Sequence, residues 1–177
     1  MRDIEKSIQE ELAQTFQGSL KFSDQFGDFV CEVPKEKIIT VLKHLRDRHK
    51  FQFMMDLCGV DYPNRPKRFD VVYHLYAPST KARVRVKTQV GETETIETAV
   101  HVWAGANWFE REAFDMFGIR FAGHPNLRKI LTHQEFVGHP LRKDYDADRQ
   151  QHATKVEDIW FEDDAGRSVD LNTGLVP

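Results

Sequence analysis

Residues 69–87 have the sequence FDVVYHLYAPSTKARVRVK, and this stretch decides the fold class. Apolar and polar residues alternate through 69–76 and again through 81–87, with the turn-forming run Ala77-Pro78-Ser79-Thr80 between them. A period of two is typical of strands with one buried face. We therefore predict two strands of an antiparallel sheet joined by a short turn.

The second of these strands places four basic residues on one face, namely Lys81, Arg83, Arg85 and Lys87. We interpret this basic ladder as a solvated sheet face. Part of its charge would be neutralised by nearby acids, Glu92, Glu94 and Glu97. A surface for a protein partner or a phosphate group is the alternative.

The chain before this hairpin predicts two helices and two strands. Apolar residues recur at helical spacing in 3–16 and 35–48, which favours amphipathic helices. Residues 29–33 form a short strand candidate that ends at Pro34. The apolar run 51–60 is typical of a central strand buried on both faces.

The chain after the hairpin is less regular. We predict a helix over 100–117 with a break near Gly105-Ala106, and then an irregular segment to residue 145. Together with the preceding elements, this order predicts a single α+β domain with a mixed or antiparallel sheet of about 4–5 strands and packed helices. The domain would span 1–145, and a polar, acidic and irregular arm would follow over 146–177.

Composition excludes several classes of protein. The chain has 177 residues and a formal net charge of −3, so a global nucleic-acid binder is not expected. It has two cysteines, Cys31 and Cys58, and no CxxC, so it cannot supply four thiolates for zinc or an iron–sulfur cluster by itself. It contains no GxGxxG and no Walker A loop. Its N-terminus lacks the apolar core of a secretory signal.

The densest group of polar residues lies in NWFEREAFDMFG, residues 107–118. Asn107 is a plausible helix N-cap and Gly118 a natural helix stop. The carboxylates of this helix, Glu110, Glu112 and Asp115, could serve acid–base catalysis or a metal, but salt bridges within the fold or to a partner are the favoured interpretation. Arg111 and Asp115 are four residues apart and can pair on the helix surface.

Two downstream segments echo each other: FAGHPNLRK at 121–129 and FVGHPLRK at 136–143. Each combines a glycine and a proline, which set the turn, with an arginine suited to a bidentate carboxylate contact. We interpret them as segments that dock on another surface. Two weaker alternatives are an RNA-binding patch over 120–143 and a metal site formed by His124, His133 and His139.

These residues resemble the signature of a known family, the thirty-kilodalton subunit (the C subunit) of proton-pumping NADH:quinone oxidoreductase, or respiratory complex I. The matching positions are Glu110, Arg111, Glu112, Asp115, Met116, Phe117, His124, Arg128, Ile130 and Leu131. Three further runs fit the family: Gly59 to Pro63, Gly105 to Trp108, and Gly138 to Tyr145. The chain departs from the family at Asp146, where many members have proline, and in the tail that follows.

The resemblance implies a structural subunit of the peripheral arm, on the cytoplasmic side of the bacterial inner membrane and attached to it only indirectly. Such a subunit carries no cofactor and no catalytic group. FMN and the iron–sulfur clusters would belong to partner subunits. The neighbours would be the forty-nine-kilodalton quinone-site subunit (the D subunit) and the adjacent iron–sulfur subunit (the B subunit), with no nucleic acid. The residues expected at the partner interface are Glu110, Arg111, Glu112, Asp115, His124, Arg128, Arg142, Lys143 and Tyr145.

Two other functions stay open at this point. A membrane-bound hydrogenase or a photosynthetic NDH complex uses a homologous subunit, and the sequence of this one component separates these assemblies poorly. A stand-alone metal-dependent hydrolase would use Glu112, Asp115 and His124.

Overall fold

The computed structural model describes residues 3–149, 151, 161–162 and 168–169. Its helices are α1 (Asp3–Thr15), α2 (Ile38–Arg48) and α3 (Ala106–Phe117), and a 3-10 turn, η1 (Lys35–Lys37), precedes α2. Its strands are β1 (Lys21–Gln25), β2 (Asp28–Glu32), β3 (Phe53–Asp61), β4 (Phe69–Ala77), β5 (Ala82–Val90), β6 (Thr95–Glu97), β7 (Arg120–Ala122), β8 (Phe161–Glu162) and β9 (Ser168–Val169).

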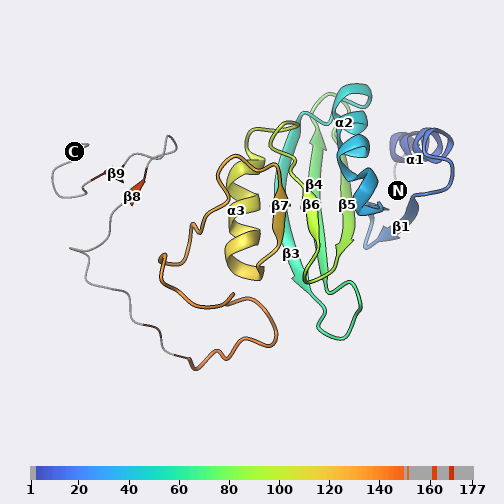
Figure 1. Cartoon of the computed structure of the whole chain (residues 1–177). Helices are drawn as coiled ribbons and strands as arrows, with labels where there is room; N and C mark the ends of the chain where they lie inside the picture. The colour runs from blue at the N-terminus through green and yellow to red at the C-terminus, as the bar shows by residue number, and fades with distance from the viewer. Residues whose placement is uncertain (1–2, 150, 152–160, 163–167, 170–177) are drawn as a thin grey trace.

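The main sheet has five strands in the order β1-β2-β5-β4-β3 (Figure 1). The predicted hairpin is its centre, since β4 and β5 pair antiparallel from Phe69 opposite Val90 to Ala77 opposite Ala82. The pair β2–β5 is parallel, so the sheet is mixed. The prediction of a single α+β domain with such a sheet is confirmed.

The core lies between this sheet and the helices. The alternate residues of β4 that face it, Phe69, Val71, Tyr73 and Leu75, are all at most 1 % exposed. Helix α2 contributes Ile38, Ile39, Val41, Leu42 and Leu45, and α1 contributes Ile8 and Leu12. Full burial of one such aliphatic side chain stabilises the fold by about 1.5–3 kcal/mol. The helices predicted over 3–16 and 35–48 are confirmed, with a 3-10 first turn in the second.

The basic ladder lies on the opposite face of the sheet, as predicted, and Arg83 is exposed there. Arg85 and Lys87 are half-buried and bond to β2 and β1: Arg85 Nη2 lies 2.5 Å from Asp28 Oδ2 on β2, and Lys87 Nζ donates to the Gln25 side chain on β1. The prediction that nearby glutamates neutralise the ladder is wrong for two of them. Glu92 pairs with Arg68 and Arg142, and Glu94 pairs with Lys35, none of which belongs to the ladder.

The apolar run 51–60 does not form a central strand. β3 lies at the sheet edge, and Phe53 and Met55 are 57 % and 50 % exposed. Only the second half of β3 is covered, by the end of α3. A Cβ on Gly59 would lie 2.7 Å from Phe117 Cδ2, so this glycine permits the close approach. The run is apolar because it packs against a helix at an edge, not because strands flank it on both sides.

The second half of the chain differs from prediction in its boundaries. Helix α3 begins at Ala106 with Gly105 as N-cap, so residues 100–105 form turns and Asn107 is not the cap. Gly118 ends the helix with φ = +76°, which confirms the predicted stop. The short strands β1, β6 and β7 escaped prediction.

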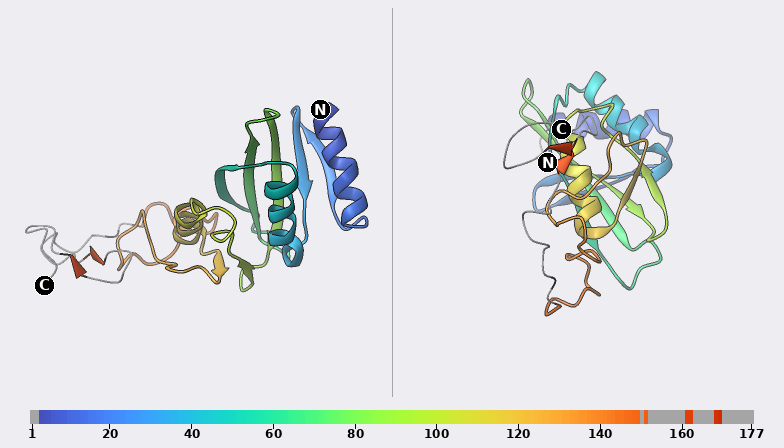
Figure 2. Two further views of the ribbon diagram at one scale, coloured as in Figure 1. Left: turned by 90° about the horizontal axis from the view of Figure 1, so that it is seen from above. Right: turned by 60° about the vertical axis from the view of Figure 1, so that its left-hand side comes forward.

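The helices α1 and α3 lie toward opposite edges of the sheet, with α2 over one face (Figure 1). Residues 123–145, which we call the return segment, run along the α3 side of the molecule, away from α1 (Figure 2). The predicted arm 146–177 lies mostly outside the described residues, and the boundary at residue 145 stays a prediction.

Candidate functional site

Helix α3 is the platform of the candidate site. Its apolar stripe packs into the core as predicted: Ala113 and Met116 are buried, and Phe109 and Phe117 are half-buried. Its end is closed by the bond from Gly118 N–H to the Phe114 carbonyl, 2.8 Å long. The helix is thus fixed against the sheet, and its polar residues are held in set directions.

Glu110 is fully buried and binds the chain that precedes the helix. Its Oε1 accepts the Ala99 N–H at 2.6 Å, and its Oε2 accepts the Thr98 hydroxyl at 2.5 Å. Burial raises the pKa of the Glu110 carboxyl to about 7, although both hydrogen bonds favour the charged form. This residue acts as an internal brace between α3 and the end of β6.

Asp115 organises the return segment. Its Oδ2 accepts the backbone N–H groups of Ile130, Leu131 and Thr132 at 2.8–3.0 Å, and its Oδ1 accepts the Thr132 hydroxyl. Burial raises the pKa of the Asp115 carboxyl, but the bonds from Thr132, Ile130 and Leu131 outweigh it and leave the pKa below its ordinary value. One carboxylate therefore fixes a full turn of irregular chain.

Arg111 and His124 hold the same segment from the other end. The Arg111 guanidinium donates to the carbonyls of Arg128 and Lys129 at 3.3 and 3.4 Å. His124 accepts the Asn126 N–H on Nδ1, so its Nε2–H donates to the Asn107 carbonyl at 3.2 Å. Burial lowers the pKa of this imidazole, which is consistent with the neutral form that these partners require.

The second echo segment docks at the C-terminal end of α3. Arg142 Nε donates to the Phe117 carbonyl at 2.6 Å, and His139 Nδ1 lies 2.9 Å from the Asp115 carbonyl. Cations are favourable at this end of a helix. Tyr145 stacks on Phe136 with ring centroids 5.9 Å apart. The docking surface predicted for this segment therefore includes the chain's own helix.

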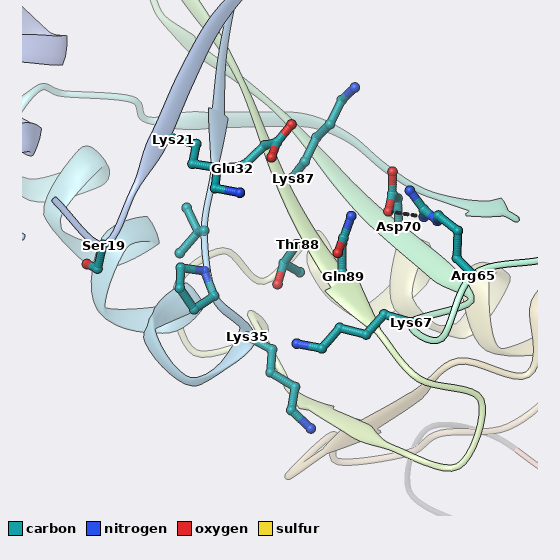
Figure 3. Close-up of a pocket in the computed structure, with 12 residues that line it drawn as sticks. Ser19, Lys21, Glu32, Lys35, Arg65, Lys67, Asp70, Lys87, Thr88 and Gln89 are labelled. Atoms are coloured by element: carbon teal, nitrogen blue, oxygen red, sulfur yellow. Dashed lines mark hydrogen bonds and ion pairs between the residues drawn. The ribbon is translucent and has the colours of Figure 1, made fainter.

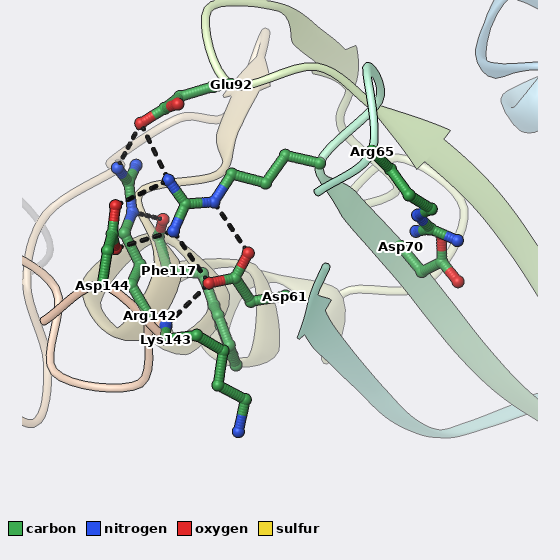
Figure 4. Close-up of polar contacts among 9 residues, drawn as sticks. Asp61, Arg65, Asp70, Glu92, Phe117, Arg142, Lys143 and Asp144 are labelled. Carbon is green, nitrogen blue, oxygen red and sulfur yellow. Dashed lines mark hydrogen bonds and ion pairs between the residues drawn. The ribbon is translucent and has the colours of Figure 1, made fainter. Parts of the chain in front are cut away.

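A cluster around Arg68 ties the return segment to the sheet, and Figure 4 shows its partners Asp61, Glu92 and Asp144. The Arg68 guanidinium makes two bonds of 2.7 and 2.9 Å to Asp61 and two of 2.7 and 2.8 Å to Asp144. Asp61 also accepts the Lys143 N–H, and Glu92 bridges Arg68 and Arg142. Hydrogen bonding to Asp61 and then Asp144 raises the pKa of Arg68, and bonding to Arg68 is the largest cause of the lowered pKa of each carboxyl.

Sequence reasoning missed Arg68 and Asp61. They lie on the two sides of the loop between β3 and β4, which the bond from Tyr62 N–H to the Arg68 carbonyl closes. The sequence signal that could have indicated this pair is an acidic and a basic residue on either side of a turn between two strands. The second carboxylate that Arg68 binds, Asp144, is 76 residues beyond Arg68, and no local pattern indicates it.

The geometry argues against the hydrolase alternative. Both Asp115 oxygens and both His124 ring nitrogens are engaged with the chain's own groups, whereas Glu112 is exposed. Within the described residues, His124, His133 and His139 form no ligand group; two other groups do, Glu11-His44-His49 and Asp56-Cys58-His74.

The Asp56-Cys58-His74 group lacks an activated nucleophile. Burial first, and then the Asp56 charge, raises the pKa of the Cys58 thiol above its ordinary value. Burial likewise lowers the pKa of His74. A nucleophilic cysteine needs a lowered pKa and an adjacent base, so this group does not meet the electrostatic requirement for that chemistry.

A polar pocket of about 260 Å³ lies at the edge of the basic face (Figure 3). Its lining includes five basic side chains, Lys21, Lys35, Arg65, Lys67 and Lys87, and two acids, Glu32 and Asp70. Asp70 already pairs with Arg65. Small-molecule sites are mostly apolar with a few convergent polar groups, and this pocket has the opposite character.

Exposed apolar side chains instead mark α3 and the return segment. Trp108 is 56 % exposed, and Leu131, Val137 and Leu141 are 52–63 % exposed. Glu112 and Lys143 are exposed in the same part of the chain. These are two of the nine residues expected at an interface. Three others are buried: Glu110, Arg111 and Asp115. The remaining four are half-buried: His124, Arg128, Arg142 and Tyr145.

The family model described as "Respiratory-chain NADH dehydrogenase, 30 Kd subunit" matches residues 31–151. This range contains α2, the sheet strands β3, β4 and β5, then α3 and the return segment. The signature residues and helix α3, on which most of them lie, are therefore both covered by the family match.

Named relatives agree with this match. The chain is 56 % identical over 160 residues to a C/D subunit of NADH-quinone oxidoreductase from Bdellovibrio bacteriovorus, covering 90 % of this chain and 29 % of the relative. It is 51 % identical over 123 residues to a C subunit of that enzyme from Rhizobium meliloti, covering 68 % and 61 %. A C subunit from Rhodopseudomonas palustris is 42 % identical, with 89 % and 78 % covered. The chain thus spans less than two thirds of the first two relatives.

The fold also occurs in a solved structure of the membrane-bound sulfane sulfur reductase, an archaeal respiratory membrane complex. The TM-score is 0.69 at 24 % identity, covering 80 % of this chain and 85 % of the other. Within the described residues, no helix combines the length and apolar character that a membrane crossing requires.

Proposed function

Because this chain belongs to the family of the 30 kDa subunit of respiratory-chain NADH dehydrogenase, we propose that it is a structural subunit of the peripheral arm of a complex I-type NADH:quinone oxidoreductase. That enzyme passes electrons from NADH through FMN and iron–sulfur centres to quinone and couples this transfer to proton translocation. The observation that carries the proposal is the family match over residues 31–151, which spans strands β3 to β5 of the sheet, α3 and the return segment.

The site supports a scaffolding role. The groups on α3 that suggested chemistry, Glu110 and Asp115, are occupied with holding the chain's own backbone. The result is a fixed surface on which Trp108, Leu131, Val137 and Leu141 face outward. Interfaces are enriched in such aromatic and aliphatic anchors, so this surface suits assembly.

The forty-nine-kilodalton quinone-site subunit is the neighbour that we propose first. The name of the relative from Bdellovibrio joins the C and D subunits, and this chain matches 29 % of its length. A fused chain holds its two parts close together, which supports contact between the separate subunits in other organisms. Contact with the iron–sulfur B subunit, a position on the cytoplasmic side of the inner membrane and indirect membrane attachment follow from the family resemblance.

We also propose that FMN and the clusters lie in partner subunits. Cys31 faces the core opposite Val86, whereas Cys58 lies opposite Val72, a residue of the other sheet face. Three strand spacings of about 4.8 Å separate β2 from β3, so the two strands lie about 14 Å apart. The two thiols therefore cannot ligate one cluster together.

A native gel tests the proposal. The chain would be tagged in its own host, membranes extracted gently, and the gel stained for NADH dehydrogenase activity. Co-migration with a very large NADH-active band is expected. A large band without NADH activity would instead indicate a hydrogenase-type or ferredoxin-linked relative, and a small soluble species would contradict assembly.

A pair of matched variants then tests the surface. Leu141 in the return segment and Met55 on β3 are similarly exposed, at 52 % and 50 %. We expect Leu141→Asp to reduce the amount of assembled complex several-fold and Met55→Asp to leave it unchanged. Equal assembly in the two strains would contradict an interface at the return segment.

A further inference from the structure

Three potential metal ligands meet where α1 packs beside α2, far from the return segment. Glu11 lies on α1, His44 on α2, and His49 is the C-cap residue of α2. His44 Nε2 lies 3.3 Å from Glu11 Oε1, and His49 Nε2 lies 3.4 Å from Glu11 Oε2. One ligand atom from each residue lies within 4.8 Å of the other two.

The distance from each histidine nitrogen to its nearer Glu11 oxygen is close to the ligand spacing of a tetrahedral zinc site, and the remaining ligand separations are within 4.8 Å. Zinc bonds to imidazole nitrogen and carboxylate oxygen are about 2.0–2.2 Å long, which places neighbouring ligands about 3.3–3.5 Å apart at tetrahedral angles. Two imidazoles and one carboxylate are a donor set that zinc uses with a fourth position left open. Glu11 retains 44 % side-chain exposure, so that position can be filled from solvent.

His49 has an unsatisfied atom at the centre of this group. Its Nε2 is buried and, despite the short distance to Glu11, makes no hydrogen bond. A buried nitrogen without a donor or acceptor is costly, and a bound ion would remove that cost.

The surroundings hold the ligands in place. Phe16 contacts the His44 ring edge to face with centroids 5.6 Å apart, and the two histidine rings are 5.5 Å apart and tilted by 55°. Only His44 and His49 lie within the range matched by the family model, 31–151, and Glu11 precedes it. The family match therefore does not account for the group.

We propose that Glu11, His44 and His49 form a binding site for a divalent transition-metal ion of the zinc type, which clamps α1 onto α2. The bound ion would be structural. Imidazole ligands favour zinc and its neighbours over magnesium or calcium, which prefer oxygen. The proposal concerns the N-terminal helices and does not depend on the proposed function.

The test uses the purified full chain without a histidine tag, stripped of metal by a chelator. Zinc is titrated in competition with a chromophoric chelator, and thermal unfolding is recorded with and without zinc. We expect one ion per chain and a rise in Tm of about 5–10 °C at a hundredfold excess over Kd. Cobalt in place of zinc would give the visible absorption of a tetrahedral site.

His49→Gln should weaken zinc binding about tenfold or more and remove the rise in Tm. His74→Gln is the matched control, because His74 belongs to the other candidate group and is likewise half-buried; it should bind as the wild type does. Glu11→Gln, at a more exposed position, keeps the test valid if His49→Gln fails to fold. Absence of zinc binding, or binding that only His74→Gln weakens, would overturn the proposal.

Discussion

The sheet with α2 is held together by apolar side chains, whereas the return segment is held on α3 by carboxylates and guanidinium groups. In the first region, Leu42, Leu45 and Tyr73 are fully buried in one core. In the second, Asp115 and the Arg68 cluster make the main contacts, and Leu131, Val137 and Leu141 face outward. Burial of apolar area tolerates small shifts, whereas charged hydrogen bonds fix direction. Charged hydrogen bonds therefore suit the return segment, because they hold its surface in one orientation.

The largest effect should come from removing the base at the centre of the polar region. Arg68→Ala leaves the Asp61 carboxylate, whose side chain is fully buried, without its main partner. Removing one member of a buried charge pair costs about 3–5 kcal/mol, and we expect a loss of that size in the free energy of unfolding. Urea denaturation of the full chain, followed by tryptophan fluorescence, measures it.

Arg83→Ala is the control for this variant, because Arg83 is exposed on the basic ladder. Its effect should stay within about 0.5 kcal/mol. If Arg68→Ala costs less than about 1 kcal/mol, the polar cluster is not what holds the return segment on the sheet, and the comparison between the regions fails.

Glu110 gives the polar region a distinctive dependence on pH. Its folded pKa of about 7 lies above the ordinary value of 4.5, so between these values the folded state binds more protons than the unfolded state. The stability contribution of Glu110 is therefore full below about pH 4.5 and is lost as the pH rises through 7. The total loss is on the order of 3 kcal/mol, at 1.36 kcal/mol per pKa unit.

The histidines with lowered pKa values change stability in the opposite direction over part of this range, so the wild-type curve alone is not decisive. Glu110→Gln leaves these histidines in place. The difference in unfolding free energy between wild type and Glu110→Gln should fall from pH 5 to about pH 7 and level off toward pH 8. A constant difference across that range would show that the buried carboxyl does not titrate there.

A local effect is expected at Asp115. Asp115→Ala removes the acceptor of three backbone N–H groups, those of Ile130, Leu131 and Thr132. Since unsatisfied buried donors cost about 1–3 kcal/mol each and are not additive, the opening free energy of this turn should fall by about 2–3 kcal/mol. Hydrogen exchange would rise at these amides and stay unchanged in β4 and β5. Equal acceleration in the strands would mean that the two regions unfold as one unit.

Some of this organisation could be predicted from the sequence because it is local. The alternation of 69–87 indicated the central hairpin, and Gly118 marked the end of α3. The parallel pair β2–β5 joins residues about 55 positions apart, and β1 has no alternating pattern of burial, so neither leaves a local signal. The sequence pattern placed Glu110, Arg111 and Asp115 on one helix, as the structure has them. It could not show that the chain folds back over them, because that depends on Asp61, Arg68 and Asp144 meeting across the molecule.

The smallest effect should come from the basic ladder, which tests whether an ion pair of similar length contributes less when it is exposed. Arg85 and Asp28 lie 2.5 Å apart, as close as many contacts in the polar cluster, but their side chains are 24 % and 52 % exposed. Solvent screens such a pair, so Arg85→Gln should change the free energy of unfolding by less than about 1 kcal/mol, and by less still in high salt. Urea denaturation at two salt concentrations measures this. A loss of several kcal/mol would mean that burial is not what separates the two sets of charges. Normal stability combined with poor assembly in the host would instead identify the ladder as a second contact surface, since only a partner would then exclude water from Arg85.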